Sequence, residues 1–294
     1  MKPFTLAGVS FWPEMWKPRK NLQELLRYVR QAAEMGAQVI ASPEGGLDGY
    51  VSRDLAKHRL RPEDKASRGY AGRLARFRAR QLALADEIKA TCIPAVRAEA
   101  ARLGVHLFVN TLDRRRGRAV YNTTFVIDPT GRIVGKYDKI HARFEVVNAL
   151  GRGHRVFQTP YAPIGVLICA DRQYPEAPRS VALAGAAVLI INSYGMWGEG
   201  ANERFIRQRA YENGLFILFC HPGESVVVSP EGRIIASTCG WERVVVRRID
   251  PAQALGRGCF GDRRMAATYL TDRDAYRRKD RQKRARRKGA RPRA

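Results

Sequence analysis

The sequence contains no long hydrophobic run. Its longest uncharged apolar stretch, residues 181–191, has 11 residues, whereas a helix that crosses a bilayer needs about 20. This stretch instead predicts a buried helix end that continues into a strand. The apolar residues near the N-terminus meet Glu14 and lack a small-residue cleavage site, so they do not fit a secretory signal. We therefore expect a cytoplasmic protein with no membrane partner.

Cysteine pairs and metal-binding clusters are also missing. The five cysteines are an odd number with no Cys-x-x-Cys spacing, which argues against a disulfide framework or a zinc knuckle. The glycines Gly151 and Gly153 lack the pattern of a phosphate-binding loop. We expect no metal and no cofactor.

Acidic residues are few, since 28 Asp and Glu stand against 53 Lys and Arg and give a net charge of +25. Residues 272–294 contribute +9 of this charge and the rest of the chain carries +16. Such a field attracts polyanions or anionic substrates, although a solvated, arginine-rich surface explains it equally. Residues 263–294 read as a basic, flexible tail, and nucleic-acid binding through 271–294 stays open as an alternative function.

The remaining sequence predicts a layered α/β fold, because stretches with strand and helix patterns alternate along it. Hydrophobic residues make up 45% of the chain, enough for a sizeable core. Residues 51–90 are rich in arginine and read as an insertion or lid whose second half forms a helix from about Ala71. A helix is expected to start at Asn21, with Glu24 completing a capping box. The expected strands are 4–9, 38–41, 105–111, 119–128, 132–137, 165–169, 187–192, 215–220, 225–228, 233–237 and 243–249; further helices are 93–103, 175–185 and 202–213.

Three residues with catalytic chemistry follow predicted strands. Cys169 ends a buried strand before a helical turn, where the helix-start amides favour a thiolate and a developing oxyanion. Glu44 follows the strand at 38–41, and Lys139 follows the strand at 132–137. Each has an ordinary alternative when taken alone: a small buried cysteine, a loop carboxylate and a solvated lysine.

Together these segments resemble the nitrilase superfamily of carbon-nitrogen hydrolases. Residues 42–50 (SPEGGLDGY) are similar to its glutamate motif, 137–141 (YDKIH) to its lysine motif and 169–176 (CADRQYPE) to its cysteine motif. The resemblance covers roughly residues 4–250 and implies a hydrolase domain over 1–262. It also implies a four-layer αββα sandwich that pairs into a homodimer or larger homo-oligomer.

The resemblance further implies a role for each residue of the site. Cys169 would attack the carbonyl carbon, Glu44 would move protons, and Lys139 with the backbone N–H of Ala170 would stabilise the oxyanion. Glu145, six residues after Lys139, stands where the family often has a second glutamate that orients the lysine and substrate. His141 is expected to support the loop after the strand rather than to carry protons.

Arg172 is relevant to substrate choice. The Asp171-Arg172 pair is similar to that of the N-carbamoyl amino acid amidohydrolase branch, in which the arginine binds the substrate carboxylate. A salt bridge to Asp171 or Glu176 is the alternative. The expected substrate is a small amide, as in the aliphatic amidase branch, or an N-carbamoyl compound. Nitrile hydrolysis by the same three residues remains an alternative, as does a polyanion-binding protein that uses the basic tail.

Overall fold

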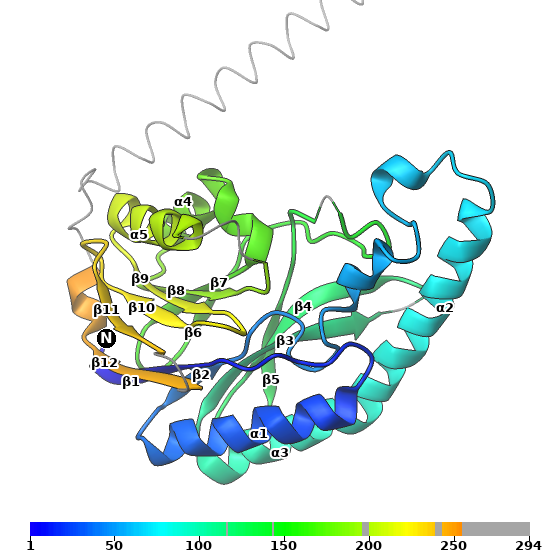
Figure 1. Ribbon diagram of the computed structural model, residues 1–294. Helices are drawn as coiled ribbons and strands as arrows, with labels where there is room; N and C mark the ends of the chain where they lie inside the picture. The colour runs from blue at the N-terminus through cyan, green and yellow to red at the C-terminus, as the bar shows by residue number, and fades with distance from the viewer. Residues whose placement is uncertain (116, 143, 196–199, 239–242, 255–294) are drawn as a thin grey trace, which may run out of the picture.

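Two six-stranded sheets lie face to face and helices cover their outer faces, as Figure 1 shows. The structure is a computed structural model that describes residues 1–115, 117–142, 144–195, 200–238 and 243–254. The expected αββα sandwich is confirmed. The basic tail predicted over 263–294, including its nucleic-acid-binding stretch 271–294, lies outside the described residues.

The first sheet has the strand order β12-β1-β2-β3-β4-β5, in which the β1-β2 and β2-β3 pairs are parallel. Helices α1 and α3 pack on its outer face, where Leu25, Val29 and Val96 are buried. Its strands are β1 (Phe4–Val9), β2 (Val39–Ala41), β3 (His106–Arg114), β4 (Val120–Ile127), β5 (Ile133–Asp138) and β12 (Val244–Ile249).

The second sheet has the order β11-β10-β9-β8-β7-β6, with parallel pairing from β7 through β8 to β9. Its central strands are fully buried and almost entirely apolar, the pattern of a parallel strand that is covered on both faces. Its strands are β6 (Val156–Gln158), β7 (Pro163–Ile168), β8 (Val188–Asn192), β9 (Phe216–Cys220), β10 (Val226–Val228) and β11 (Ile234–Ser237). Strand β6 was not among those expected from the sequence.

The α-helices of the described residues are α1 (Pro18–Glu34), α2 (Tyr70–Glu87), α3 (Ile93–Leu103), α4 (Glu176–Leu183) and α5 (Ala201–Asn213). Short 3-10 turns cover Val51–Leu55, Pro62–Asp64, Cys169–Gln173 and Pro251–Ala254. A π-helical turn, Ile88–Cys92, joins α2 to α3 just before Pro94, where it accommodates a residue that cannot donate a backbone hydrogen bond. None of the described helices is long and apolar enough to span a bilayer.

The start of α1 differs from the prediction. The helix begins at Pro18, which fits the first helical position because that position needs no N–H donor. Asn21 therefore lies inside the first turn, and the capping box with Glu24 does not form. The Asn21 side chain instead accepts a hydrogen bond from the backbone N–H of Glu14 at 2.8 Å and donates one to the carbonyl of Leu47 at 2.8 Å. Asn21 thus anchors the loop that carries the glutamate motif.

The arginine-rich segment 51–90 forms the expected helix, α2, which projects past the edge of the sandwich in Figure 1. A small separate core of Leu55, Leu60, Phe77 and Val147 holds it against the loop after β5. Gln81 adds a hydrogen bond of 2.7 Å to the Asn148 side chain. The segment is thereby tied to the loop that carries Glu145, and its role as an insertion or lid remains a prediction.

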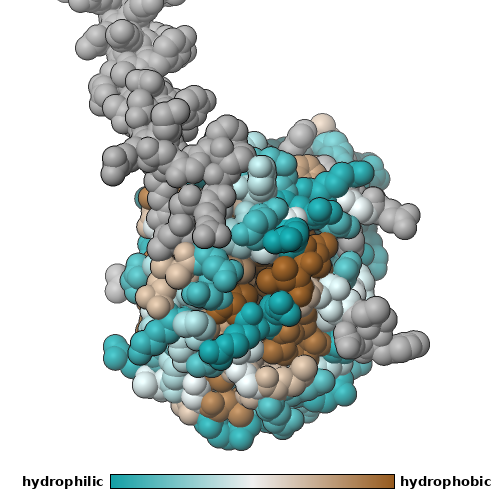
Figure 2. Space-filling view, turned by 90° about the vertical axis from the view of Figure 1, so that its left-hand side faces the viewer, coloured by the Kyte–Doolittle hydropathy of each residue, from teal (hydrophilic) through white to brown (hydrophobic). Residues whose placement is uncertain are grey.

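An apolar area lies among hydrophilic side chains on the face at the β11–β12 end of the molecule, shown in Figure 2. Contiguous exposed apolar surface is typical of interaction sites in proteins. The expected homo-oligomer stays a prediction, for which a sedimentation measurement is the direct check.

Candidate active site

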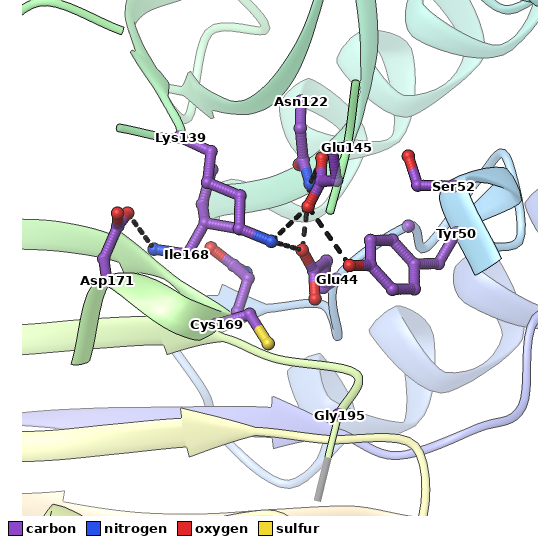
Figure 3. A network of polar contacts seen from close by, with 12 residues as sticks. Glu44, Tyr50, Ser52, Asn122, Lys139, Glu145, Ile168, Cys169, Asp171 and Gly195 are labelled. Carbon is purple, nitrogen blue, oxygen red and sulfur yellow. Dashed lines mark hydrogen bonds and ion pairs between the residues drawn. The ribbon is translucent and has the colours of Figure 1, made fainter. Parts of the chain in front are cut away.

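The three motif residues meet in one buried place between the sheets, as the close-up in Figure 3 shows. Glu44 follows β2, Lys139 follows β5 and Cys169 follows β7. Hydrogen bonds from Asn192, at the end of β8, join the two sheets there: its Nδ2 donates to the Ser42 carbonyl at 2.6 Å and its Oδ1 accepts from Thr124 at 2.8 Å. The site is therefore built where the ends of strands from both sheets converge.

Glu44 is fully buried, and its two oxygens have different surroundings. Oε1 accepts hydrogen bonds from Lys139 Nζ at 2.7 Å and from Asn122 Nδ2 at 2.9 Å. Oε2 has no hydrogen-bond partner among the described residues and lies toward Cys169 in Figure 3. Burial, and next the negative charge on Cys169, raise the pKa of Glu44 well above its ordinary value. Oε2 is thus placed to hold a proton for exchange with the substrate.

Lys139 is 2% exposed and lies between two carboxylates. Its Nζ donates to Glu44 and to Glu145 Oε1. Burial alone lowers the pKa of Lys139, but the charges of Glu145 and Glu44 raise it well above its ordinary value. An ammonium has three N–H donors, and two of them have these partners among the described residues. The third remains for a substrate oxygen.

Glu145 is fixed by several donors. Besides Lys139, its Oε1 accepts from the Tyr50 hydroxyl at 3.1 Å, and its Oε2 accepts from Asn122 at 3.2 Å and from Asn148 at 2.6 Å. Both oxygens are engaged, in contrast to Glu44. The position of Glu145 fits the expected role of orienting Lys139.

Cys169 opens the 3-10 turn after β7 with φ +44°, a backbone region that non-glycine residues rarely occupy. Burial raises the pKa of its thiol, but Lys139 and then Arg172 more than offset this effect and lower it to about 6. The N–H of Ala170 belongs to the first turn, whose amides have no acceptor inside the turn. The sulfur therefore lies beside a cation, at the start of a helical turn.

Arg172 is 1% exposed, and both of its Nη atoms contact protein groups. Nη1 donates to the Cys169 carbonyl at 2.6 Å, and Nη2 donates to the Gly195 carbonyl at 3.1 Å and to Asn202. Among the described residues, Arg172 forms no ion pair with Asp171 or Glu176. This geometry gives no support to the expectation that Arg172 binds a substrate carboxylate, nor to a salt bridge with either neighbour.

Several residues of the site were not identified from the sequence. Asn122, on β4, contacts both glutamates. Tyr50 ends the glutamate motif, and its hydroxyl reaches Glu145. The available signal was weak: Asn122 is a polar residue on a buried strand, and such residues need a partner. The described residues contain no group of three His, Cys, Asp or Glu side chains suited to hold a metal.

Comparisons with known proteins identify the family. The sequence profile of the carbon-nitrogen hydrolase family matches residues 6–255. The chain is 25% identical to an omega-amidase of Xenopus tropicalis over 274 residues, covering 85% of this chain and 90% of that protein. It is 28% identical to the 2-oxoglutaramate amidase of Bacillus subtilis over 265 residues, covering 84% and 91%.

Solved structures show the same fold. A mutant of the amidase from Nesterenkonia sp. AN1 superposes with a TM-score of 0.70 at 19% identity, covering 86% of this chain and 93% of that one. That structure shows covalent addition of the acetamide moiety of fluoroacetamide at the active-site cysteine of the amidase. Nit3 of Saccharomyces cerevisiae, a nitrilase-superfamily member, gives a TM-score of 0.68 at 19% identity, covering 86% of this chain and 92% of that one. With a family profile matched over most of its length, the chain belongs to the carbon-nitrogen hydrolase family of the nitrilase superfamily.

Proposed function

We propose that this hydrolase cleaves the carbon-nitrogen bond of a small amide through a thioester on Cys169, with Glu44 and Lys139 as its catalytic partners. One observation carries the proposal: a buried carboxylate with a free oxygen, an ammonium with a free N–H and a thiol of lowered pKa converge from three strands. The similarity to amidases of several organisms supports an amide as the substrate class.

The proposed reaction begins with the Cys169 thiolate. The sulfur attacks the carbonyl carbon and the C=O π pair moves onto oxygen, where Lys139 Nζ and the Ala170 N–H stabilise the charge. One such donor is worth about 3 kcal/mol of barrier. As the oxyanion collapses and the C–N bond breaks, Glu44 gives its proton to the leaving nitrogen.

The second half-reaction releases the acid. Glu44, now ionised, takes a proton from water while the water oxygen attacks the thioester carbon. The C–S bond breaks, and the sulfur leaves as a thiolate. Glu44 is again protonated, so one water is consumed and one amine or ammonia is produced per turnover.

A substrate panel tests the proposal. Ammonia release is measured with simple carboxamides, ω-amides of dicarboxylic acids, N-carbamoyl amino acids and nitriles. The Cys169→Ala variant is assayed alongside Cys92→Ala, which removes another buried thiol, from the helix layer of the first sheet. We expect turnover of a carboxamide that is lost in Cys169→Ala and kept in Cys92→Ala. Full turnover by Cys169→Ala would contradict the thioester mechanism, and preference for N-carbamoyl compounds or nitriles would contradict the substrate class.

A further inference from the structure

We propose that Arg172 is a catalytic residue of this hydrolase, whose guanidinium holds the sulfur of Cys169 as a thiolate before attack and when the sulfur leaves the acyl group. The inference rests on the proposed function and adds a second cation to its mechanism. Arg172 Nη1 lies 3.5 Å from Cys169 Sγ and 2.6 Å from the carbonyl oxygen of the same residue. The guanidinium therefore contacts the reacting atom directly.

The guanidinium is fixed in this position before any substrate binds. Nη2 is held by the Gly195 carbonyl and by Asn202 on α5. From the same helix, Arg209 donates to the backbone carbonyls of Arg172 at 3.1 Å and of Gln173 at 3.3 Å. The turn and the arginine side chain are thus both anchored to α5, so the cation needs no rearrangement to act on the sulfur.

Among the described residues, Arg172 has no acidic partner, and this supports the role. Arginine stays protonated in proteins, and a buried cation is costly without an anion beside it. The partners of Arg172 among the described residues are uncharged carbonyl and amide oxygens, the ring of Phe219 and the sulfur. Ionised Cys169 is therefore the anion that this arginine contacts in the described structure.

The surroundings of the sulfur define which other groups affect its ionisation. Glu44 and Tyr50 approach from the loop after β2, and Lys139 approaches from the loop after β5, with Glu145 behind it. Ser193 and the backbone of Tyr194, which follow β8, lie near the sulfur and also lower the pKa of Cys169. His221, which also interacts with the charge of Arg172, has its pKa lowered to about 4, mainly by burial, so it adds little competing positive charge near neutral pH.

The two cations serve different atoms during the reaction. Lys139 faces Glu44 and the developing oxyanion, whereas Arg172 faces the sulfur. When the C–S bond forms, the sulfur loses its charge and the attraction to Arg172 ends. When water displaces the sulfur, the negative charge returns to it and Arg172 stabilises the leaving thiolate. Arg172 therefore favours both the nucleophile and the leaving group.

Alkylation tests this role without a substrate. The rate of iodoacetamide modification of Cys169 is measured from pH 5 to 9.5, with the site identified by mass spectrometry, for the unmodified chain, Arg172→Gln and Arg172→Lys. The control is Arg207→Gln, which also removes one arginine charge. Arg207 lies on α5, is half-exposed and donates to the Gly232 carbonyl.

We expect the midpoint of the Arg172→Gln profile to move up by roughly one to two pH units, with the rate recovering at high pH. Arg172→Lys should shift less because it keeps a charge, and Arg207→Gln should not shift. An unchanged midpoint in Arg172→Gln would overturn the proposal. A loss of rate that is equal at every pH would also overturn it, since this indicates damaged packing. Failure of the amide panel together with a shifted profile would reject the proposed function, whereas the stabilisation of the Cys169 thiolate by Arg172 would stand.

Discussion

Asp171 and His141 are joined by two contacts: the backbone N–H of His141 donates to Asp171 Oδ1 at 2.8 Å, and His141 Nδ1 lies 2.8 Å from the same oxygen. The other oxygen of Asp171 accepts from the backbone N–H of Ile168 at 3.0 Å and from the Tyr137 hydroxyl at 2.8 Å. A single buried carboxylate thus links the turn that begins at Cys169 to the loop after β5.

This link predicts the behaviour of Asp171→Asn. The amide NH2 would face backbone or hydroxyl donors on one side, and leaving a buried donor unpaired costs about 1–3 kcal/mol. We expect lower stability and a fall in kcat, because the sulfur is no longer held against the Lys139 loop. Denaturant unfolding and steady-state kinetics measure the two effects.

Asp113→Asn is the matched control, since Asp113 is also buried but pairs with Arg115 and Lys136 on the first sheet. It should lose stability and keep its kcat. Equal losses of kcat in both variants would contradict the link between Asp171 and the catalytic residues.

The two glutamates should respond differently to amidation. Glu44 has a free oxygen for proton transfer, whereas both oxygens of Glu145 are engaged. We expect Glu44→Gln to lower kcat by about 10²- to 10⁴-fold, the usual contribution of a general acid or base. Glu145→Gln should lower kcat less, because it disturbs only the position of Lys139. Steady-state kinetics on the best amide measure both effects. A larger loss of kcat in Glu145→Gln than in Glu44→Gln would mean that Glu145 transfers the proton and Glu44 positions Lys139.

The sequence predicted the elements that deliver the catalytic groups better than it predicted the contacts around them. Phe4–Val9 forms the strand that its pattern indicates, and Gly104 ends α3 with φ +67°, as glycine after a helix does. Cys169, Glu44 and Lys139 lie at strand ends as expected. These features are local, because each depends on residues within a few positions of one another.

What the sequence could not indicate depends on contacts between distant segments. Arg172 is three residues from Cys169, but its orientation is set by Asn202, thirty residues farther along the chain. Asn122 meets Glu44 across 78 positions of sequence. Pairings of this kind follow from how the two sheets stack, which no local pattern encodes. The capping box at Asn21 was wrong for a local reason, because the helix begins three residues earlier, at Pro18, and Asn21 lies inside its first turn.

The turn after Glu44 should tolerate no side chain at Gly45. This residue has φ +66°, and a Cβ there would lie 2.3 Å from the backbone nitrogen of Tyr50. Gly36 also has a positive φ, +83°, but a Cβ there meets nothing within 4 Å. Gly36→Ala should therefore lower the free energy of unfolding only by the cost of the left-handed conformation, about 1 kcal/mol.

In Gly45→Ala the clash should lower the free energy of unfolding by a further 1–3 kcal/mol, approximately. It should also lower activity, because the backbone that moves carries Glu44 on one side and Tyr50 on the other. Urea unfolding of the two variants gives the comparison, and equal stability losses would show that the turn relaxes around the added methyl group.

The ionisation of Cys169 can be followed in the unmodified chain. Lys139 and Arg172 hold the pKa of this thiol at about 6 despite its burial, so the thiolate is present above that pH and is lost below it. Iodoacetamide reacts with the thiolate, so the rate of modification should rise with pH, with a midpoint near 6, and level off above it. An unperturbed cysteine would have its midpoint near pH 8.5. Cys220 is the internal control, because burial raises its pKa and it should stay unmodified across the range. A midpoint for Cys169 near that of a free cysteine would mean that the proton rests on sulfur, and that Glu44 must remove it before attack.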